Sequence, residues 1–146
     1  MTVVVGLGAA GAGDDAVGLL VARRLAAEGW PARETSDATS LLSLFDRGER
    51  IILVDAWCET TRAGTLLRVS PDALAAGDAL VSTHGLSIRD VLALGIELYG
   101  EHNVRVEIVA IAIDPSDCDP GELSAPVRAG MEAAVDLIRS MLRAMS

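Results

Sequence analysis

The strongest constraint on the fold of this chain is an apolar segment, residues 2–7, that runs straight into a glycine-rich turn. Nearly every position of the segment is β-branched or apolar, which is typical of a strand buried on both faces. A strand of that kind occurs in parallel sheets that are covered by helices on each side. We therefore expect residues 2–7 to form a central strand of an α/β domain.

Two further apolar runs, residues 50–56 and 104–114, repeat this pattern, and each ends on an acid, Asp55 or Asp114. Apolar residues at helical spacing predict a helix between the turn and Gly29. The alternation of strands and helices predicts a three-layer α/β/α domain with a largely parallel central sheet, and a mixed sheet is left open. Further patterns predict a weak strand at 31–35, a short helix from Leu41 that finishes before Gly48, an edge strand at 64–69, a turn or helix at 71–76, a helix capped by Ser87 and Asp90, and a closing helix capped by Ser124.

Length and composition exclude several classes of protein. The 146 residues fit one domain, 1–146, whose core needs no disulfide or metal to hold it together. A net charge of -9, with no lysine and all 12 basic side chains arginine, disfavours a nucleic-acid-binding surface. The apolar runs are shorter than the roughly 20 residues of a membrane span. The first residues show no secretory pattern, so we expect a cytoplasmic protein.

The two cysteines, Cys58 and Cys118, are too few for a disulfide framework and do not form a C-x-x-C pair. Free cysteines are among the most buried residue types. We therefore expect both to be buried free thiols.

The glycine-rich turn supports two different interpretations. Gly6, Gly8 and Gly11 spell G-x-G-x-x-G after a strand, the dinucleotide-binding fingerprint, in which backbone amides hold a pyrophosphate. Asp14 and Asp15 follow directly and would place negative charge where the phosphates should lie, which favours a helix cap or a cation instead. We expect Asp14 to cap the following helix and Asp15 to bind a ligand.

A second acid and a histidine complete a candidate metal site. Asp55 stands at the carboxyl end of its predicted strand, and His84 lies in a polar loop ahead of a helix, whereas His102 lies in a polar surface turn. In open α/β sheets ligands bind outside the carboxyl ends of the strands. If Asp15, Asp55 and His84 converge there, they provide two oxygen ligands and one nitrogen ligand, with room for water, as an open metal site requires.

The turn, Gly6-Leu7-Gly8-Ala9-Ala10-Gly11-Ala12-Gly13-Asp14-Asp15-Ala16-Val17-Gly18, resembles the motif G-x-G-N-x-L-x-x-D-D/E-G-x-G of the nickel-iron hydrogenase maturation endopeptidases, with the same spacing. Segments 53–56 and 82–92 are similar to the second and third ligand regions of that family. Segments 111–115 and 121–127 resemble its last strand and the start of its last helix. The resemblance therefore covers nearly the whole chain. Three positions depart from the motif, namely Ala9 for Asn, Gly11 for Leu and Ala16 for Gly.

This resemblance implies a hydrolase that cleaves a C-terminal extension from the precursor of a hydrogenase large subunit after nickel insertion. Asp15, Asp55 and His84 would contact the nickel of the precursor and carry the catalysis. Because the sequence supplies no Ser-His or Cys-His pair, we expect metal-assisted hydrolysis without an acyl-enzyme. Two alternatives stay open, a Rossmann-like dinucleotide-binding protein with Glu34 as its ribose-binding acid, and a non-catalytic chaperone that binds the precursor, which the three departures motivate.

Overall fold

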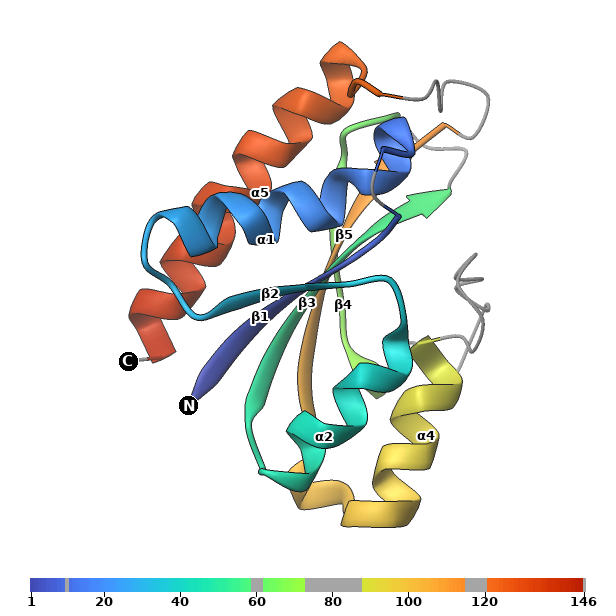
Figure 1. Ribbon diagram of the computed structural model, residues 1–146, viewed down its shortest axis with the longest axis vertical. Helices are drawn as coiled ribbons and strands as arrows, with labels where there is room; N and C mark the ends of the chain where they lie inside the picture. Colours follow the sequence, from blue (N-terminus) through green and yellow to red (C-terminus); the bar gives the residue numbers. More distant parts are fainter. Residues whose placement is uncertain (10, 59–61, 73–87, 115–120, 146) are drawn as a thin grey trace.

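The structure is a computed structural model that describes residues 1–9, 11–58, 62–72, 88–114 and 121–145. These residues form a five-stranded sheet between two layers of helices (Figure 1). The elements are β1 (Thr2–Leu7), the 3-10 turn η1 (Gly13–Ala16), α1 (Val17–Ala27), β2 (Ala32–Thr35), the 3-10 turn η2 (Ala38–Ser40), α2 (Leu41–Asp46), β3 (Arg50–Cys58), β4 (Leu66–Val69), α4 (Ile88–Tyr99), the 3-10 turn η3 (Glu101–Asn103), β5 (Arg105–Ile113) and α5 (Ala125–Met145).

The sheet is mixed and has the strand order β2-β1-β3-β5-β4. The first four strands in this order are parallel to one another, whereas β4 runs antiparallel to β5. A parallel crossover needs a dozen or more residues, and the connection between β3 and β4 is shorter than that. This explains why β4 runs opposite to the other strands, and it confirms the predicted edge strand.

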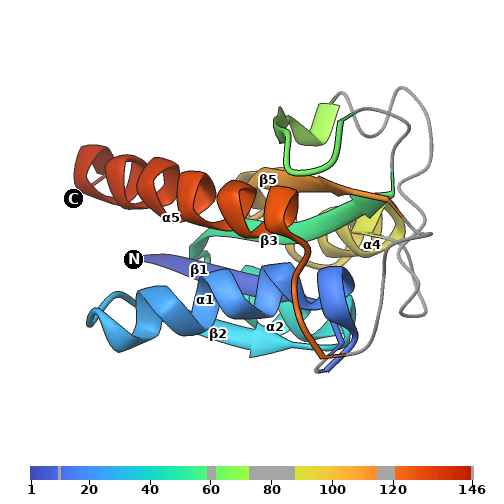
Figure 2. The same cartoon turned by 90° about the horizontal axis from the view of Figure 1, so that it is seen from above.

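Helices α1 and α5 pack on one face of the sheet and α2 and α4 on the other, so the predicted three-layer arrangement is confirmed (Figure 2). Alternate side chains of β1 point to opposite faces: Val3 and Val5 pack with the α2 and α4 side, and Val4 packs with the α1 and α5 side. The apolar side chains on the two faces of the sheet form two buried clusters. Every residue of β1 from Val3 to Leu7 is buried. Strand β1 is therefore a buried interior strand, between β2 and β3, as its apolar run predicts.

Most predicted elements are confirmed, but the prediction for one cysteine is wrong. Strand β3 continues two residues beyond Ala56, and its last residue, Cys58, is exposed rather than buried because it emerges at the edge of the sheet. Cys118, Ser87 and residues 73–76 lie outside the described residues. A single domain over 1–146 stays a prediction.

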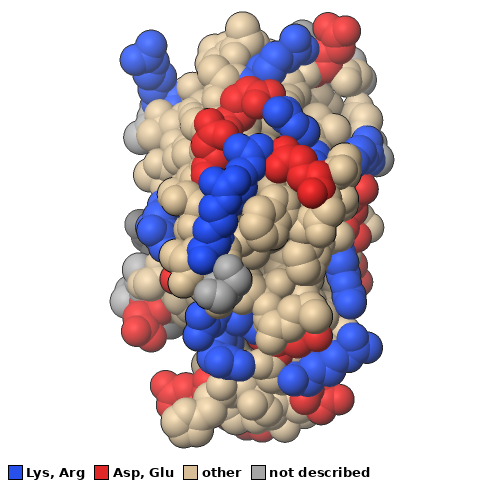
Figure 3. Space-filling model, turned by 90° about the vertical axis from the view of Figure 1, so that its left-hand side faces the viewer, with Lys and Arg blue, Asp and Glu red and all other residues tan. Residues whose placement is uncertain are grey.

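None of the helices in the described ranges has both the length and the hydrophobicity to span a membrane. On the face shown in Figure 3, basic and acidic side chains are interspersed and do not form a broad basic patch.

Candidate active site

The position of the site follows from the order of the strands. From β1 the chain moves to β2 on one side, and then returns to β3 on the other side of β1. The carboxyl ends of β1 and β3 therefore flank the point at which the winding reverses, where α/β sheets bind their ligands. Asp15 follows β1 in the turn η1, and Asp55 lies on β3 directly after Val54, the residue that pairs with Gly6. The structure thus brings two of the predicted site residues to this point.

The glycines of the turn serve close packing between β1 and α1. A Cβ on Gly6 would lie 2.7 Å from the Cβ of Ala22, and a Cβ on Gly18 would lie 2.6 Å from the carbonyl oxygen of Val54. Gly11 differs, because its φ is +74° and a Cβ there would meet no atom of the described residues within 4 Å. In the dinucleotide fingerprint the third glycine is needed for close packing of helix and strand. Gly11 does not have that role, so the turn is not built as a pyrophosphate cradle.

The prediction that Asp14 caps the following helix is wrong. Helix α1 begins after Ala16, which makes no side-chain cap. Asp14 is buried, and its carboxylate accepts hydrogen bonds from the backbone N–H of Ser124 at 2.7 Å and from the Ser124 hydroxyl at 2.8 Å. Asp14 lies within η1, two residues before the Ala16 N-cap of α1, and it contacts the start of α5 instead. Ser124 directly precedes α5 and its carbonyl accepts from the N–H of Arg128, so the predicted start of the closing helix is confirmed.

Asp55 is only 6% exposed, and its carboxylate accepts a hydrogen bond from the N–H of Ala56 at 2.8 Å. Burial raises the pKa of Asp55 to about 7, the bond from Ala56 opposes this rise, and the negative charge of Asp15 adds to it. A buried carboxylate beside a second negative charge is stabilised by a nearby cation. The electrostatics at this end of β3 therefore suit a metal ion.

Asp15 is half-buried in η1 and lies near enough for its charge to act on Asp55. Cys58 is a further neighbour that the sequence analysis did not place at the site. Partial burial, and then the charges of Asp15 and Asp55, raise the pKa of the Cys58 thiol.

The third predicted ligand, His84, lies outside the described residues. Within the described ranges, no three His, Cys, Asp or Glu side chains gather closely enough to hold a metal ion. Asp15 and Asp55 supply carboxylate oxygens, which form part of a ligand set for a divalent cation. His102 is exposed in η3, as its polar turn predicts, and Asp114 is exposed after β5.

Comparisons with known proteins agree with this architecture. The family model HycI, hydrogenase maturation protease, matches residues 36–141. The NiFe hydrogenase maturation protease HybD from Thermococcus kodakarensis is 30% identical, with a TM-score of 0.70 over 96% of this chain and 97% of that chain. The protease HycI from Thermococcus kodakarensis KOD1 is 27% identical, with a TM-score of 0.65 over 97% and 92% of the two chains. The hydrogenase maturating endopeptidase HybD from E. coli shares the fold at 23% identity, with a TM-score of 0.73 over 99% and 93%. A search of curated proteins gives no match.

Proposed function

This chain belongs to the hydrogenase maturation protease family and is an endopeptidase, and we propose that it removes a C-terminal extension from a nickel-loaded hydrogenase large-subunit precursor. The proposal is supported by two carboxylates, Asp15 and Asp55, at the point where ligands bind to α/β sheets. The nickel belongs to the precursor, so it is part of the substrate.

Within this proposal Asp15, Asp55 and His84 bind the nickel of the precursor and are the catalytic residues. The observation that carries it is the environment of Asp55, which is 6% exposed and lies beside a second negative charge. This proximity is unfavourable for folding, since the charge of Asp15 adds to the rise in the pKa of Asp55. A divalent cation reverses this, because both carboxylates then contact a positive charge. The role of His84 rests on the sequence.

The proposed cleavage is metal-assisted hydrolysis. The carboxylates and the imidazole orient the precursor by its metal, which polarises the peptide carbonyl for attack by water. Cys58 is a poor candidate for a nucleophile, because burial and the two nearby carboxylates raise its pKa and favour the unreactive thiol. An acyl-enzyme mechanism gains no support from these surroundings.

The two alternatives gain no support from the described residues. A dinucleotide-binding protein is disfavoured because Gly11 does not pack between strand and helix and because Asp14 places a buried charge beside the turn. A non-catalytic chaperone rests only on the motif departures at Ala9, Gly11 and Ala16. A cytoplasmic location and the absence of nucleic-acid and membrane partners stay predictions from the sequence.

A processing assay tests the proposal. Precursor with and without nickel is incubated with the wild type and with Asp15→Ala, Asp55→Ala, His84→Ala and the control His102→Ala, and the product is identified by its mass. We expect cleavage of the nickel-loaded precursor by the wild type and the control, with a rate at least about 100-fold lower in the three site variants. Equal cleavage by all variants, or equal cleavage of precursor without nickel, would contradict the site assignment.

A further inference from the structure

The turn that carries Asp15 is joined to the start of α5 at two places. The carboxylate of Asp14 accepts the two hydrogen bonds from Ser124, at 2.7 and 2.8 Å. The backbone N–H of Gly121 donates to the carbonyl oxygen of Gly11 at 3.1 Å. Asp14 and Ser124 are 110 residues apart in the sequence. A contact of this separation links the site turn to a distant element rather than closing a local cap.

The start of α5 is held in place by packing on two sides, so it can restrain the turn that carries Asp15. Helix α5 has 21 residues, and its apolar face is buried against β5 and α1. On its other side, a Cβ on Gly64 would lie 2.8 Å from the carbonyl carbon of Pro126, and a Cβ on Gly130 would lie 2.9 Å from the Cα of Gly64. The turn before β4 thus packs directly on the first turns of α5. Movement of this helix end would disrupt packing on both sides.

The chemistry of the contact makes it strong. The first N–H groups of a helix lack partners within the helix and carry partial positive charge, which a carboxylate satisfies. Hydrogen bonds to a charged acceptor are shorter and stronger than neutral ones. Asp14 is 1% exposed, so water does not compete for these bonds. The burial of this charge is therefore compensated by Ser124.

The backbone of the next residue, Asp15, is restrained from both sides. Its N–H donates to the carbonyl oxygen of Ala12 at 3.3 Å within the turn. Its own carbonyl oxygen lies where a Cβ on Gly8 would approach to 2.8 Å, so it rests against the end of β1. With Asp14 bound to Ser124, the direction in which the Asp15 side chain leaves the backbone is set.

We propose that Asp14 is a positioning residue, which with Ser124 holds the turn 11–15 against α5 so that the Asp15 carboxylate faces Asp55. Asp14 itself contacts no ligand, and its effect passes through Asp15. The part of this inference that concerns nickel rests on the proposed function, whereas the part that concerns the turn does not. The two parts need separate measurements.

The test uses graded variants and a matched control. Asp14→Ala removes the acceptor, and Ser124→Ala removes one donor but keeps the backbone N–H. Asp14→Asn keeps the shape and can still accept one bond and donate another. Ser124→Thr restores the hydroxyl. The control Asp37→Ala removes another carboxylate cap, since Asp37 accepts from the N–H of Thr39 at 2.9 Å.

Amide hydrogen exchange measures the local opening of the turn 11–15 in the absence of metal. We expect exchange at Asp15 and Ala16 to accelerate roughly tenfold or more in Asp14→Ala, less in Ser124→Ala and little in Asp14→Asn and Ser124→Thr, because local opening follows the lost contacts. Asp37→Ala should leave these two amides unchanged. Unchanged exchange in Asp14→Ala would overturn the inference.

Calorimetric titration with Ni²⁺ measures how the position of Asp15 affects the dissociation constant for nickel. Loss of a group that orients a metal ligand raises the dissociation constant by about 10-fold to 100-fold, and we expect this range for Asp14→Ala with recovery in Asp14→Asn. Opening of the turn with unchanged nickel affinity would show a structural contact alone and overturn the positioning role. If the wild type binds no free Ni²⁺, the positioning role is read from cleavage of the nickel-loaded precursor, where Asp14→Ala should lower the rate about 10-fold to 100-fold and an unchanged rate would overturn the role. The exchange measurement decides in either case whether Asp14 holds the turn.

Discussion

Two acids are buried at the same edge of the sheet, and they differ in what surrounds them. Asp14 is 1% exposed and accepts two hydrogen bonds from Ser124 at the start of α5. Asp55 is 6% exposed, and its carboxylate accepts from the N–H of its own neighbour, Ala56. Burial and the charge of Asp15 then raise the pKa of Asp55 to about 7.

The difference shows which acid serves the fold and which is available for a ligand. The fold supplies donors from a distant helix to Asp14, so its charge stabilises the native structure. Asp55 is also buried, and the nearby charge of Asp15 adds to the rise in its pKa, which is unfavourable for folding. A buried acid whose pKa is raised in this way is typical of functional sites. The contrast between the two acids can be tested by substitutions.

The largest expected effect is an increase in stability from Asp55→Asn. The amide keeps the acceptor for Ala56 and carries no charge, so it avoids the cost of ionising a buried acid. A pKa raised from 3.8 to about 7 corresponds to about 4 kcal/mol, so we expect a gain approaching that value at pH 8. Urea unfolding at pH 8 measures it, and the same variant should lose processing activity.

The pH dependence of the wild type provides the control for this variant. The folded state holds the Asp55 proton more tightly than the unfolded state, so the unfolded state binds fewer protons between pH 4 and about 7. The free energy of unfolding therefore falls as the pH rises through this window. Asp55→Asn should lack this part of the fall. Parallel pH profiles of the two proteins would show that Asp55 has no raised pKa.

A smaller effect of opposite sign is expected for Asp14→Ala. This substitution leaves the N–H and hydroxyl of Ser124 without their acceptor at a buried helix start. Hydrogen bonds to charged groups contribute about 1.5–3 kcal/mol, so we expect a loss of about 2–3 kcal/mol in urea unfolding at pH 7. A gain in stability, as for Asp55→Asn, would remove the distinction between the two acids.

Asp15→Asn should change the free energy of unfolding by less than Asp14→Ala does. The change arises because the substitution alters the pKa of Asp55. The charge of Asp15 is the second of the two causes that raise the Asp55 pKa, after burial. Its removal should move the pH-dependent fall in stability to lower pH and increase stability at pH 8 by less than about 1 kcal/mol. An identical pH profile in this variant would mean that the two carboxylates do not interact.

How much of this could be predicted from sequence depends on the range of the interactions involved. The apolar runs of β1, β3 and β5 predict buried parallel strands, because burial on both faces requires apolar residues at successive positions. The same runs place Asp55 near a carboxyl end. These features are local, and they are confirmed.

The wrong predictions concern contacts between distant residues. Asp14 has the right residue type and position for a local cap, but its partner, Ser124, is 110 residues away and belongs to another helix. Cys58 has a type that is usually buried, but β3 extends past the core and exposes it. His84 lies outside the described residues and stays a prediction.

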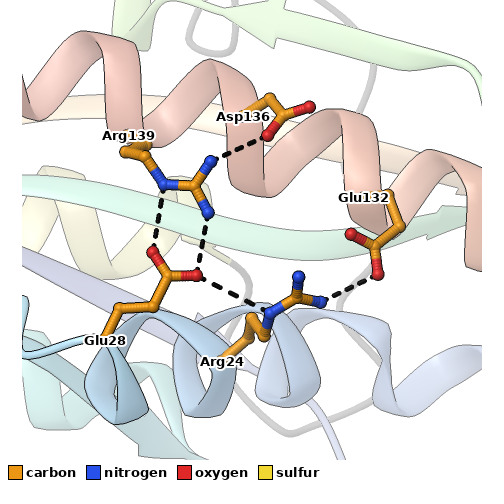
Figure 4. A network of polar contacts seen from close by, with 5 residues as sticks. All are labelled: Arg24, Glu28, Glu132, Asp136 and Arg139. Atoms are coloured by element: carbon orange, nitrogen blue, oxygen red, sulfur yellow. Dashed lines mark hydrogen bonds and ion pairs between the residues drawn. The ribbon is translucent and has the colours of Figure 1, made fainter.

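The smallest effect is expected where acids are exposed and paired. On the outer face of α1 and α5, Glu28 accepts two hydrogen bonds from Arg139 at 2.8 and 3.0 Å, and Arg24 pairs with both Glu28 and Glu132 (Figure 4). Exposed ion pairs contribute little because water and salt screen them. Glu28→Gln should leave the urea midpoint unchanged within error at 0.5 M salt. A loss as large as that of Asp14→Ala would show that burial is not what separates the acids.

The most direct measurement is the titration of the Asp55 carboxyl carbon by NMR, without metal and with Zn²⁺ as a diamagnetic divalent ion. We predict a midpoint near pH 7 in the metal-free protein and a marked fall when the ion is present, because the cation favours the carboxylate. A midpoint near 4 under both conditions would contradict the account, because Asp55 would then have an ordinary pKa that does not respond to a metal ion.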